Sequence, residues 1–159
     1  MAEKRVILFA LDGSENAQNA LNWYFTKWRK DGDELHGFCA WEHAHLATFS
    51  LSAPFKLPSD EWQKVVNETI ERVNKVKSQF EKACQQYKVK GHFKEKNCKP
   101  GEGICAAAEE FHADLIVMGT RGLSSLRRTV LGSVSDYVLH HTHIPVAVVP
   151  TPPQKPASD

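Results

Sequence analysis

The chain has 159 residues, 42% of them hydrophobic, and its 20 basic and 19 acidic residues leave a formal net charge of +1. This length fits one domain with a substantial hydrophobic core. The near-neutral charge argues against nucleic acid or a membrane surface as partner, and no apolar run approaches the roughly 20 residues of a membrane span.

The cysteines and the first residues of the chain bear on its compartment. Cys39, Cys84, Cys98 and Cys105 form no Cys-x-x-Cys pair, and residues 1–5 lead directly into a strand-like run without the pattern of a signal peptide. We therefore expect a reduced, cytoplasmic protein. Whether Cys98 or Cys105, which flank a predicted turn, is redox-active stays open.

The N-terminal part of the chain alternates strand-like and helix-like segments. Residues 5–11 are a continuous apolar run, typical of a strand that is buried on both faces. Residues 12–14 predict a turn and a helix cap, and apolar residues at helical spacing then continue over residues 17–28. Residues 35–41 predict a second strand, whereas residues 42–58 show no period and predict a long loop.

The same alternation continues to the C-terminus. Apolar residues at helical spacing over residues 62–87 predict one long amphipathic helix. The remaining predicted elements are a strand over residues 89–95, a helix over 100–111, a strand over 115–118, a helix from residue 132 and a strand over 145–149.

Strands that alternate with helices predict an α/β fold. We expect residues 1–150 to form a single Rossmann-like domain, a five-stranded parallel sheet with helices on both faces, and residues 151–159 to form a disordered proline-rich tail. Asp12, Ala40 and Gly119 lie at the carboxyl ends of three predicted strands. These residues can converge only if the first and fourth strands are neighbours, as in the strand order 3-2-1-4-5.

A glycine pattern lies between the fourth predicted strand and the last predicted helix. The chain reads Gly119-Thr120-Arg121-Gly122, then nine residues without glycine, then Gly132-Ser133. Glycine lets backbone amides approach a phosphate closely, and a helix that begins at Gly132-Ser133 directs its free N–H groups to the same point. The pattern therefore predicts a phosphate cradle and a nucleotide ligand. The alternative is that these glycines serve only turns and helix packing.

The same segment carries a family resemblance. Residues 114–122, 131–135 and 145–150 resemble the C-terminal half of the universal stress protein family, and residues 7–14 resemble its opening strand and acidic turn. The resemblance covers roughly residues 4 to 150. The spacing Gly-x2-Gly-x9-Gly-Ser matches the pattern of the ATP-binding branch of that family.

The resemblance implies a nucleotide-binding site and a role for each of its residues. Gly119, Gly122, Gly132 and Ser133 would hold the phosphates and ribose, and Val134 would lend a backbone amide. The remaining implied contacts are Ala40 to the adenine through its backbone, Met118 packed nearby, and Asp12 beside the nucleotide.

The chemistry of the charged residues agrees with this assignment and leaves some alternatives open. Asp12 would repel phosphates unless a nucleotide-bound Mg²⁺ lies between them; alternatively, Asp12 only supports the turn. Arg121, Arg127 and Arg128 could neutralise a triphosphate. For Arg127 and Arg128 we favour a solvated surface position. Ser133 could cap the last helix and donate its hydroxyl to a phosphate oxygen.

We therefore expect an ATP-binding protein, with Mg²⁺, that regulates or protects under stress as a homodimer rather than acting as an enzyme. The resemblance implies pairing through the last strand, from Val146 to Val149, and an exposed apolar edge strand favours it. The protein partners are unknown.

The alternative functions are a nucleotide-independent interaction or chaperone-like scaffold, a slow ATPase, and an NADP-binding protein. The last rests on residues 101–106, which fit the fingerprint Gly-x-Gly-x-x-Ala.

Histidines form two further groups. His43 and His45 follow Glu42 and could bind a metal, but no third ligand stands at a suitable spacing. His140 and its neighbours His141 and His143 cluster at the end of the last predicted helix, where cations interact favourably with the helix dipole.

Overall fold

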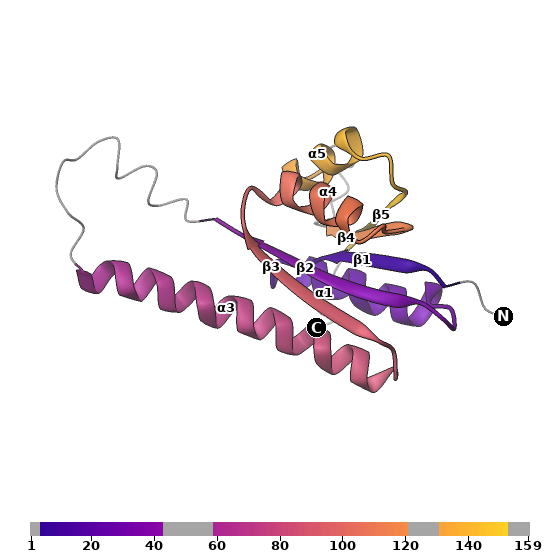
Figure 1. The fold of residues 1–159 in the computed structure, drawn as a ribbon, viewed down its shortest axis with the longest axis horizontal. Coiled ribbons are helices and arrows are strands. Elements are labelled where there is room, and N and C mark those ends of the chain that lie inside the picture. The colour runs from indigo at the N-terminus through magenta and orange to yellow at the C-terminus, as the bar shows by residue number, and fades with distance from the viewer. Residues whose placement is uncertain (1–3, 43–58, 121–130, 153–159) are drawn as a thin grey trace, which may run out of the picture.

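A parallel five-stranded sheet forms the centre of the structure, a computed structural model that describes residues 4–42, 59–120 and 131–152 (Figure 1). The sheet order is β3-β2-β1-β4-β5, so the predicted order 3-2-1-4-5 is confirmed. β1 therefore lies between β2 and β4, with Leu8 opposite both His36 and Ile116. The strands are β1 (Val6–Ala10), β2 (Glu34–Trp41), β3 (Gly91–Asn97), β4 (Leu115–Thr120) and β5 (Val146–Pro150).

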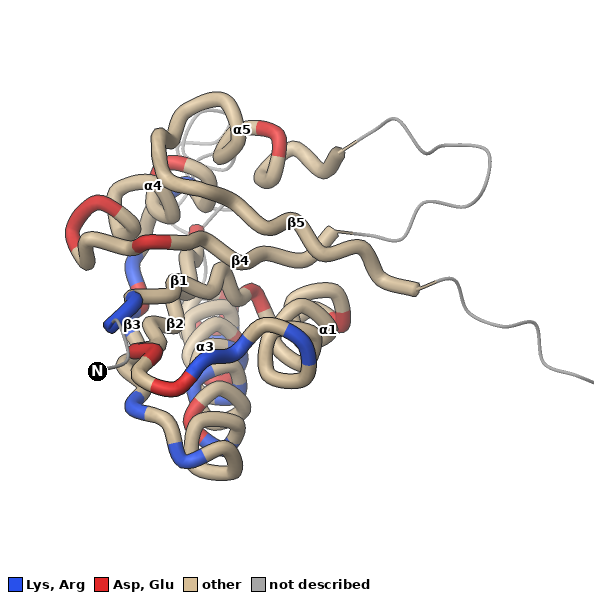
Figure 2. Tube along the Cα trace, turned by 90° about the vertical axis from the view of Figure 1, so that its right-hand side faces the viewer, with Lys and Arg blue, Asp and Glu red and all other residues tan. Residues whose placement is uncertain are grey.

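Helices cover both faces of the sheet, as predicted (Figures 1 and 2). One face carries α1 (Glu15–Trp23), η1 (Tyr24–Trp28) and α3 (Ser59–Gln86), and the other carries α4 (Pro100–Glu110) and α5 (Ser133–His141). Successive side chains of a strand point to opposite faces, so Ile7 and Phe9 enter one core and Leu8 the other. Each face of the sheet thus forms its own hydrophobic core with the helices that cover it.

The first helix begins where the sequence predicted and ends differently. Gly13 has φ +82°, and the Ser14 hydroxyl accepts a hydrogen bond from the Ala17 N–H at 3.2 Å, which caps α1. The predicted single helix is instead an α-helix that continues as the π-helical turn η1. The hydrogen bond that identifies the π-helical turn runs from the Arg29 N–H to the Tyr24 carbonyl, five residues earlier, at 2.9 Å.

The long amphipathic helix is confirmed as α3, but its apolar stripe is not buried throughout. Val73, Val76, Phe80 and Cys84 are buried against the sheet, whereas Ile70 is 52% exposed. Figure 1 shows the reason: the first part of α3 extends past the end of the sheet where β2 ends.

The third strand begins later than predicted because the end of α3 uses the residues before it. Lys88 has φ +53°, and the Val89 N–H bonds to the Cys84 carbonyl at 3.0 Å. This is the left-handed ending that commonly closes a helix. Val89 therefore belongs to the helix ending, and β3 runs from Gly91 to Asn97 rather than over residues 89–95.

No helix in the described ranges is both long enough and apolar enough to cross a bilayer. Of the predicted tail, Thr151 is held by both α1 and β4: its hydroxyl donates to the Asn16 side-chain oxygen at 2.7 Å, and its N–H donates to the Thr120 carbonyl at 3.2 Å. Residues 153–159 lie outside the described part of the chain. So does the predicted loop, apart from Glu42.

Candidate functional site

A cavity of about 600 Å³ opens at the carboxyl ends of β1, β2 and β4. This is where open α/β sheets bind ligands, because the chain leaves neighbouring strands in opposite directions there. Part of the cavity lining is apolar, as in most small-molecule sites. Its apolar side chains include Ala10, Phe38, Ala40, Ile104 and Met118, which belong to one hydrophobic cluster or pack against it.

Another part of the cavity lining is polar and contains the beginning of α5. Gly132 is the N-cap, and the first intrahelical bond runs from the Asp136 N–H to the Gly132 carbonyl at 2.9 Å. The N–H groups of Ser133, Val134 and Ser135 therefore have no acceptor within the helix. Together with the positive end of the helix dipole, they can bind an anion.

The prediction that Ser133 caps α5 is wrong by one residue. Gly132 occupies the N-cap position and Ser133 is the first residue of the helix. The nearby hydroxyl that bonds to the backbone belongs to Ser135, which donates to the Gly132 carbonyl at 2.9 Å. Within the described part of the chain the structure gives the Ser133 hydroxyl no partner, so this hydroxyl remains available to a ligand.

The two described glycines of the motif differ in what requires them. A Cβ on Gly119 would lie 2.1 Å from the Asn16 carbonyl oxygen, so packing of β4 against α1 excludes any side chain there. Among the described residues, a Cβ on Gly132 would meet only the Ser135 Oγ, at 3.6 Å, and the backbone of Gly132 is ordinary extended chain with φ −63°. Packing among the described residues therefore requires glycine at position 119 but not at position 132.

Asp12 is held in the turn at the cavity edge. Its Oδ1 accepts a hydrogen bond from the Ser14 N–H at 2.9 Å, so the turn-supporting role is present. Asp12 is also the only charged residue among the described residues that line the cavity. An anionic ligand would thus meet this carboxylate with no described basic side chain to offset it.

The structure brings together all the predicted site residues that it describes. The cavity lining contains Asp12, Ala40, Met118, Gly119, Gly132, Ser133 and Val134. Arg121 and Gly122 lie outside the described residues, as do Arg127 and Arg128. The binding role of each residue stays a prediction.

Several lining residues were not predicted. Asn16 lies in the first turn of α1, and its position after the cap Ser14 was the available signal. Phe38 and Ile104 come from the middle of β2 and the first turns of α4. Their apolar character indicates only burial, and the sequence gives no sign that they face a cavity.

The glycines of the dinucleotide fingerprint serve packing. A Cβ on Gly101 would lie 2.5 Å from the Tyr137 ring, and a Cβ on Gly103 would lie 2.4 Å from the Cys98 sulfur. Close contact of α4 with α5 and with the end of β3 thus accounts for both residues. The other proposed ligand group, His43 and His45, lies outside the described residues.

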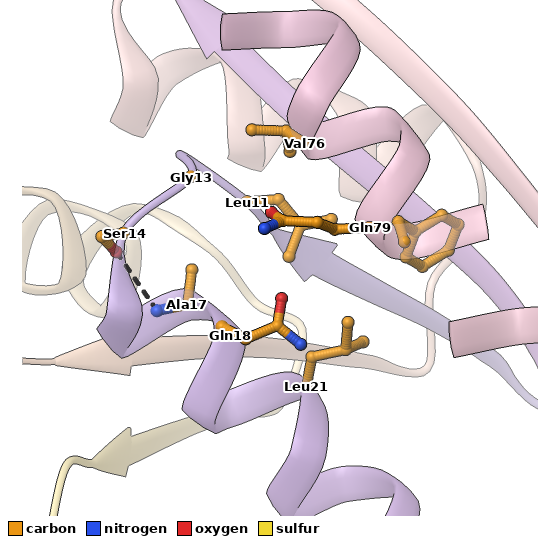
Figure 3. Close-up of a pocket in the computed structure, with 9 residues that line it drawn as sticks. Leu11, Gly13, Ser14, Ala17, Gln18, Leu21, Val76 and Gln79 are labelled. Carbon is orange, nitrogen blue, oxygen red and sulfur yellow. Dashed lines mark hydrogen bonds between the residues drawn. The ribbon is translucent and has the colours of Figure 1, made fainter. Parts of the chain in front are cut away.

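A second, much smaller gap lies between α1 and α3 (Figure 3). Leu11, Ser14 and Gln18 border it on one side and Val76 and Gln79 on the other. Its volume of about 10 Å³ is the space of a single water. It is a packing gap and cannot hold a ligand.

The thiols are in their protonated form. Burial raises the pKa of Cys39 and of Cys84 to about 11, and it also raises the pKa of Cys98 and of Cys105. A reactive cysteine needs a lowered pKa, because the thiolate is the nucleophile.

The strand order, and the cavity at the carboxyl ends of β1, β2 and β4, define a doubly wound, Rossmann-like α/β protein. Residues 4–150 match the universal stress protein family, and the chain belongs to that family. Universal stress protein Slr1101 of Synechocystis sp. is 37% identical over 95 residues, which cover 58% of this chain and 82% of the relative.

Two solved structures share the fold. The protein MJ0577 superposes with a TM-score of 0.71 at 22% identity, covering 96% of this chain and 100% of its own. A universal stress protein family protein from Arabidopsis thaliana with AMP bound gives a TM-score of 0.70 at 15% identity, covering 94% of this chain and 93% of its own.

Proposed function

We propose that this protein binds ATP with Mg²⁺ in the 600 Å³ cavity and acts as a dimeric regulator or protectant in the stress response. The observation that carries the proposal is Gly132. The described residues around it and its backbone conformation leave room for a side chain, yet the residue is glycine, directly before the free N–H groups of α5. A ligand that contacts this backbone accounts for the glycine.

The apolar and polar parts of the cavity lining match the two ends of a nucleotide. The adenine would lie against Phe38, Ile104 and Met118, with the Ala40 backbone at the ring edge. The phosphates would accept hydrogen bonds from the first N–H groups of α5 and from the Ser133 hydroxyl. The AMP bound to the Arabidopsis protein of the same fold supports a nucleotide as the ligand class.

Asp12 fits a divalent cation better than a direct phosphate contact. It is a carboxylate at the cavity edge, and Mg²⁺ prefers oxygen ligands from one or two carboxylates together with phosphate oxygens. The bound ion would offset the repulsion between Asp12 and the phosphates. Arg121, the residue after β4 in the sequence, is the proposed basic contact to the phosphates.

The same lining favours binding over rapid hydrolysis. Among its described residues there is no histidine or lysine, and its one carboxylate, Asp12, is the group assigned to Mg²⁺. Fast hydrolysis needs a group that orients and deprotonates the attacking water. We therefore propose at most slow turnover of ATP.

Calorimetric titration of the nucleotide-stripped chain with ATP and Mg²⁺ tests the proposal, with NADPH as the comparison. We expect ATP to bind and Gly132→Val to weaken it by more than about a hundredfold, since losing two charge-assisted hydrogen bonds costs about 3 kcal/mol or more. The proposal would be overturned if the wild-type chain did not bind ATP. It would also be overturned if Gly132→Val, with the same thermal stability as the wild type, bound ATP equally well. Preferential binding of NADPH would favour the NADP alternative instead.

A scaffold that does not need nucleotide is the second candidate, and the exposed part of α3 favours it. Ile70 is 52% exposed and Trp62 is 36% exposed on a segment that extends beyond the sheet. A stress-survival assay of cells that carry Gly132→Val separates the two functions. Loss of protection supports the nucleotide-dependent role, whereas full protection by a variant that no longer binds ATP supports the scaffold.

The dimer would form through β5, which is one edge of the sheet. The Ile116 N–H bonds to the Pro145 carbonyl at 2.9 Å, so the backbone groups of Val146 and Val148 point to the free edge. We expect Val148→Pro to give a monomer in light scattering, because it removes an edge N–H. Val148→Ala loses similar packing but keeps the N–H and should remain a dimer; equal masses for the two variants would contradict pairing through this edge.

A reducing compartment such as the cytoplasm suits the thiols. Cys39, Cys84, Cys98 and Cys105 are all free. We propose a cytoplasmic location on this ground.

A further inference from the structure

A cavity of about 490 Å³ lies at the end of the sheet opposite the proposed nucleotide site. It is formed where β2 and β3 begin, whereas the nucleotide cavity lies at the carboxyl ends of the strands. Three potential metal ligands line it: Glu34, His36 and His92. None of them has a role in the function proposed above.

The strand register places the three side chains together. His36 on β2 and His92 on β3 are direct partners in the parallel pairing. Glu34 precedes His36 by two residues, so its side chain lies on the same face of the sheet. One imidazole and one carboxylate from β2 thus meet an imidazole from the edge strand β3.

The distances match those around a tetrahedral zinc ion. The Glu34 Oε1 lies 3.3 Å from the His36 Nε2 and 3.5 Å from the His92 Nε2. Two ligands of a tetrahedral Zn²⁺, each about 2.0–2.1 Å from the metal, are about 3.3–3.4 Å apart. One ligand atom from each of the three residues lies within 4.8 Å of the others, so a small rotation of the exposed His92 ring closes the set.

The His36 ring is held by packing rather than by a full set of hydrogen bonds. It packs against Phe111 with ring centroids 4.4 Å apart, and its side chain is only 12% exposed. Among the described residues its buried Nδ1 has no hydrogen-bond partner. The nitrogen that faces Glu34 is Nε2, so Nε2 and not Nδ1 would be the zinc ligand.

The neighbouring lysines leave the ligand atom of Glu34 accessible. Lys4 and Lys90 contact the other carboxylate oxygen, Oε2, at 2.7 and 3.8 Å, while Oε1 faces the two imidazoles. Both ammonium groups are exposed and screened by solvent. Lys4 can also act as an outer-shell partner that orients the carboxylate.

We propose that Glu34, His36 and His92 form a Zn²⁺ site. Imidazole and carboxylate ligands suit zinc, and three protein ligands leave a fourth position that water or a small anion can occupy from the cavity. The ion would join the edge strand β3 to β2. It would thus stabilise the fold as well as bind a ligand.

Calorimetry of the metal-free full chain with Zn²⁺ tests the site, in a background where His43→Ala and His45→Ala remove two other histidines. We expect one equivalent of zinc. His92→Ala should weaken binding by at least the roughly 10–100-fold that even outer-shell changes cause. The matched control is His140→Ala, which removes an exposed histidine on α5 and should bind zinc like the background chain.

Two further measurements keep the result clear of folding effects. Glu34→Gln keeps the size of the side chain and should also lose zinc, and Zn²⁺ should raise the melting temperature of the background chain but not of either variant. Co²⁺ in the site should give the intense visible absorption of tetrahedral coordination. Absence of zinc binding, or binding that survives both His92→Ala and Glu34→Gln, would overturn the proposal. Gly132→Val should bind zinc normally, so this test is independent of ATP.

Discussion

Gly119→Ala is expected to lower the free energy of unfolding by more than about 3 kcal/mol, at the upper end of what overpacking a core usually costs. The added Cβ would lie 2.1 Å from the Asn16 carbonyl oxygen and 2.9 Å from the Ala17 nitrogen. Both are backbone atoms of α1, so no side-chain rotation relieves the clash. Either α1 moves away from β4 or the strand end is displaced, and the loss should appear in urea unfolding.

The matched variant at the other glycine is Gly132→Ser. Serine is among the best N-cap residues, and the extended backbone of Gly132 accepts it, so stability should stay within a few tenths of a kcal/mol or rise. The new hydroxyl would bond to the same N–H groups that the proposal assigns to phosphate. ATP binding should therefore weaken while the fold is kept. Similar stability losses in Gly119→Ala and Gly132→Ser would contradict the separate roles of the two glycines.

These two glycines also mark how far the sequence could predict the site. The motif located the cavity, because glycines and a helix start after a buried strand are local features. It could not distinguish a glycine that packing requires, Gly119, from one that the described packing does not require, Gly132. That distinction depends on Asn16, whose carbonyl is brought against Gly119 only by the docking of α1 on β4.

The fold was predictable for a similar reason, and its boundaries were not. Continuous apolar runs predicted the strands, and the need to bring residues such as Asp12 at their ends together predicted the strand order. The start of β3 was misplaced because Val89 is a good strand residue that the ending of α3 uses instead. The meeting of His36 with His92 depends on the register of β2 against β3, which no spacing within the sequence encodes.

Asp33→Ala is expected to lower the free energy of unfolding by about 3–5 kcal/mol, the usual cost of breaking a buried ion pair. The Asp33 side chain is fully buried, and Arg5 donates to both of its oxygens, from Nε at 2.8 Å and from Nη2 at 2.7 Å. The Tyr24 hydroxyl and the Lys30 N–H, at 2.9 Å, donate to Oδ2 as well. The carboxylate thus joins the residue before β1, the turn η1 and the start of β2.

The stability difference between wild type and Asp33→Asn should depend on pH, and the pKa shift of Asp33 gives the direction of that dependence. Burial alone would raise the pKa of Asp33, but the hydrogen bonds from Arg5, Tyr24 and the Lys30 N–H outweigh it, and the pKa is lowered. The carboxylate therefore stabilises the fold above the pKa of the unfolded chain, about 3.9, and this contribution is lost as the pH falls toward the lower pKa of the folded state. The stability difference between wild type and Asp33→Asn should be full near pH 7 and should shrink below about pH 4.

Asp31→Asn is the control, since Asp31 lies two residues away and its side chain is 99% exposed. Its pairing with Arg29, at 3.9 Å, should contribute less than about 1 kcal/mol. Urea unfolding at several pH values measures the three variants against the wild type. Equal losses for Asp31→Asn and Asp33→Asn, or a loss in Asp33→Asn that does not change with pH, would mean that packing rather than this carboxylate holds η1 to β1 and β2. A large, acid-sensitive loss confined to Asp33 would instead make it the polar anchor of the first β-α-β unit, at the end of the sheet where β1 and β2 begin.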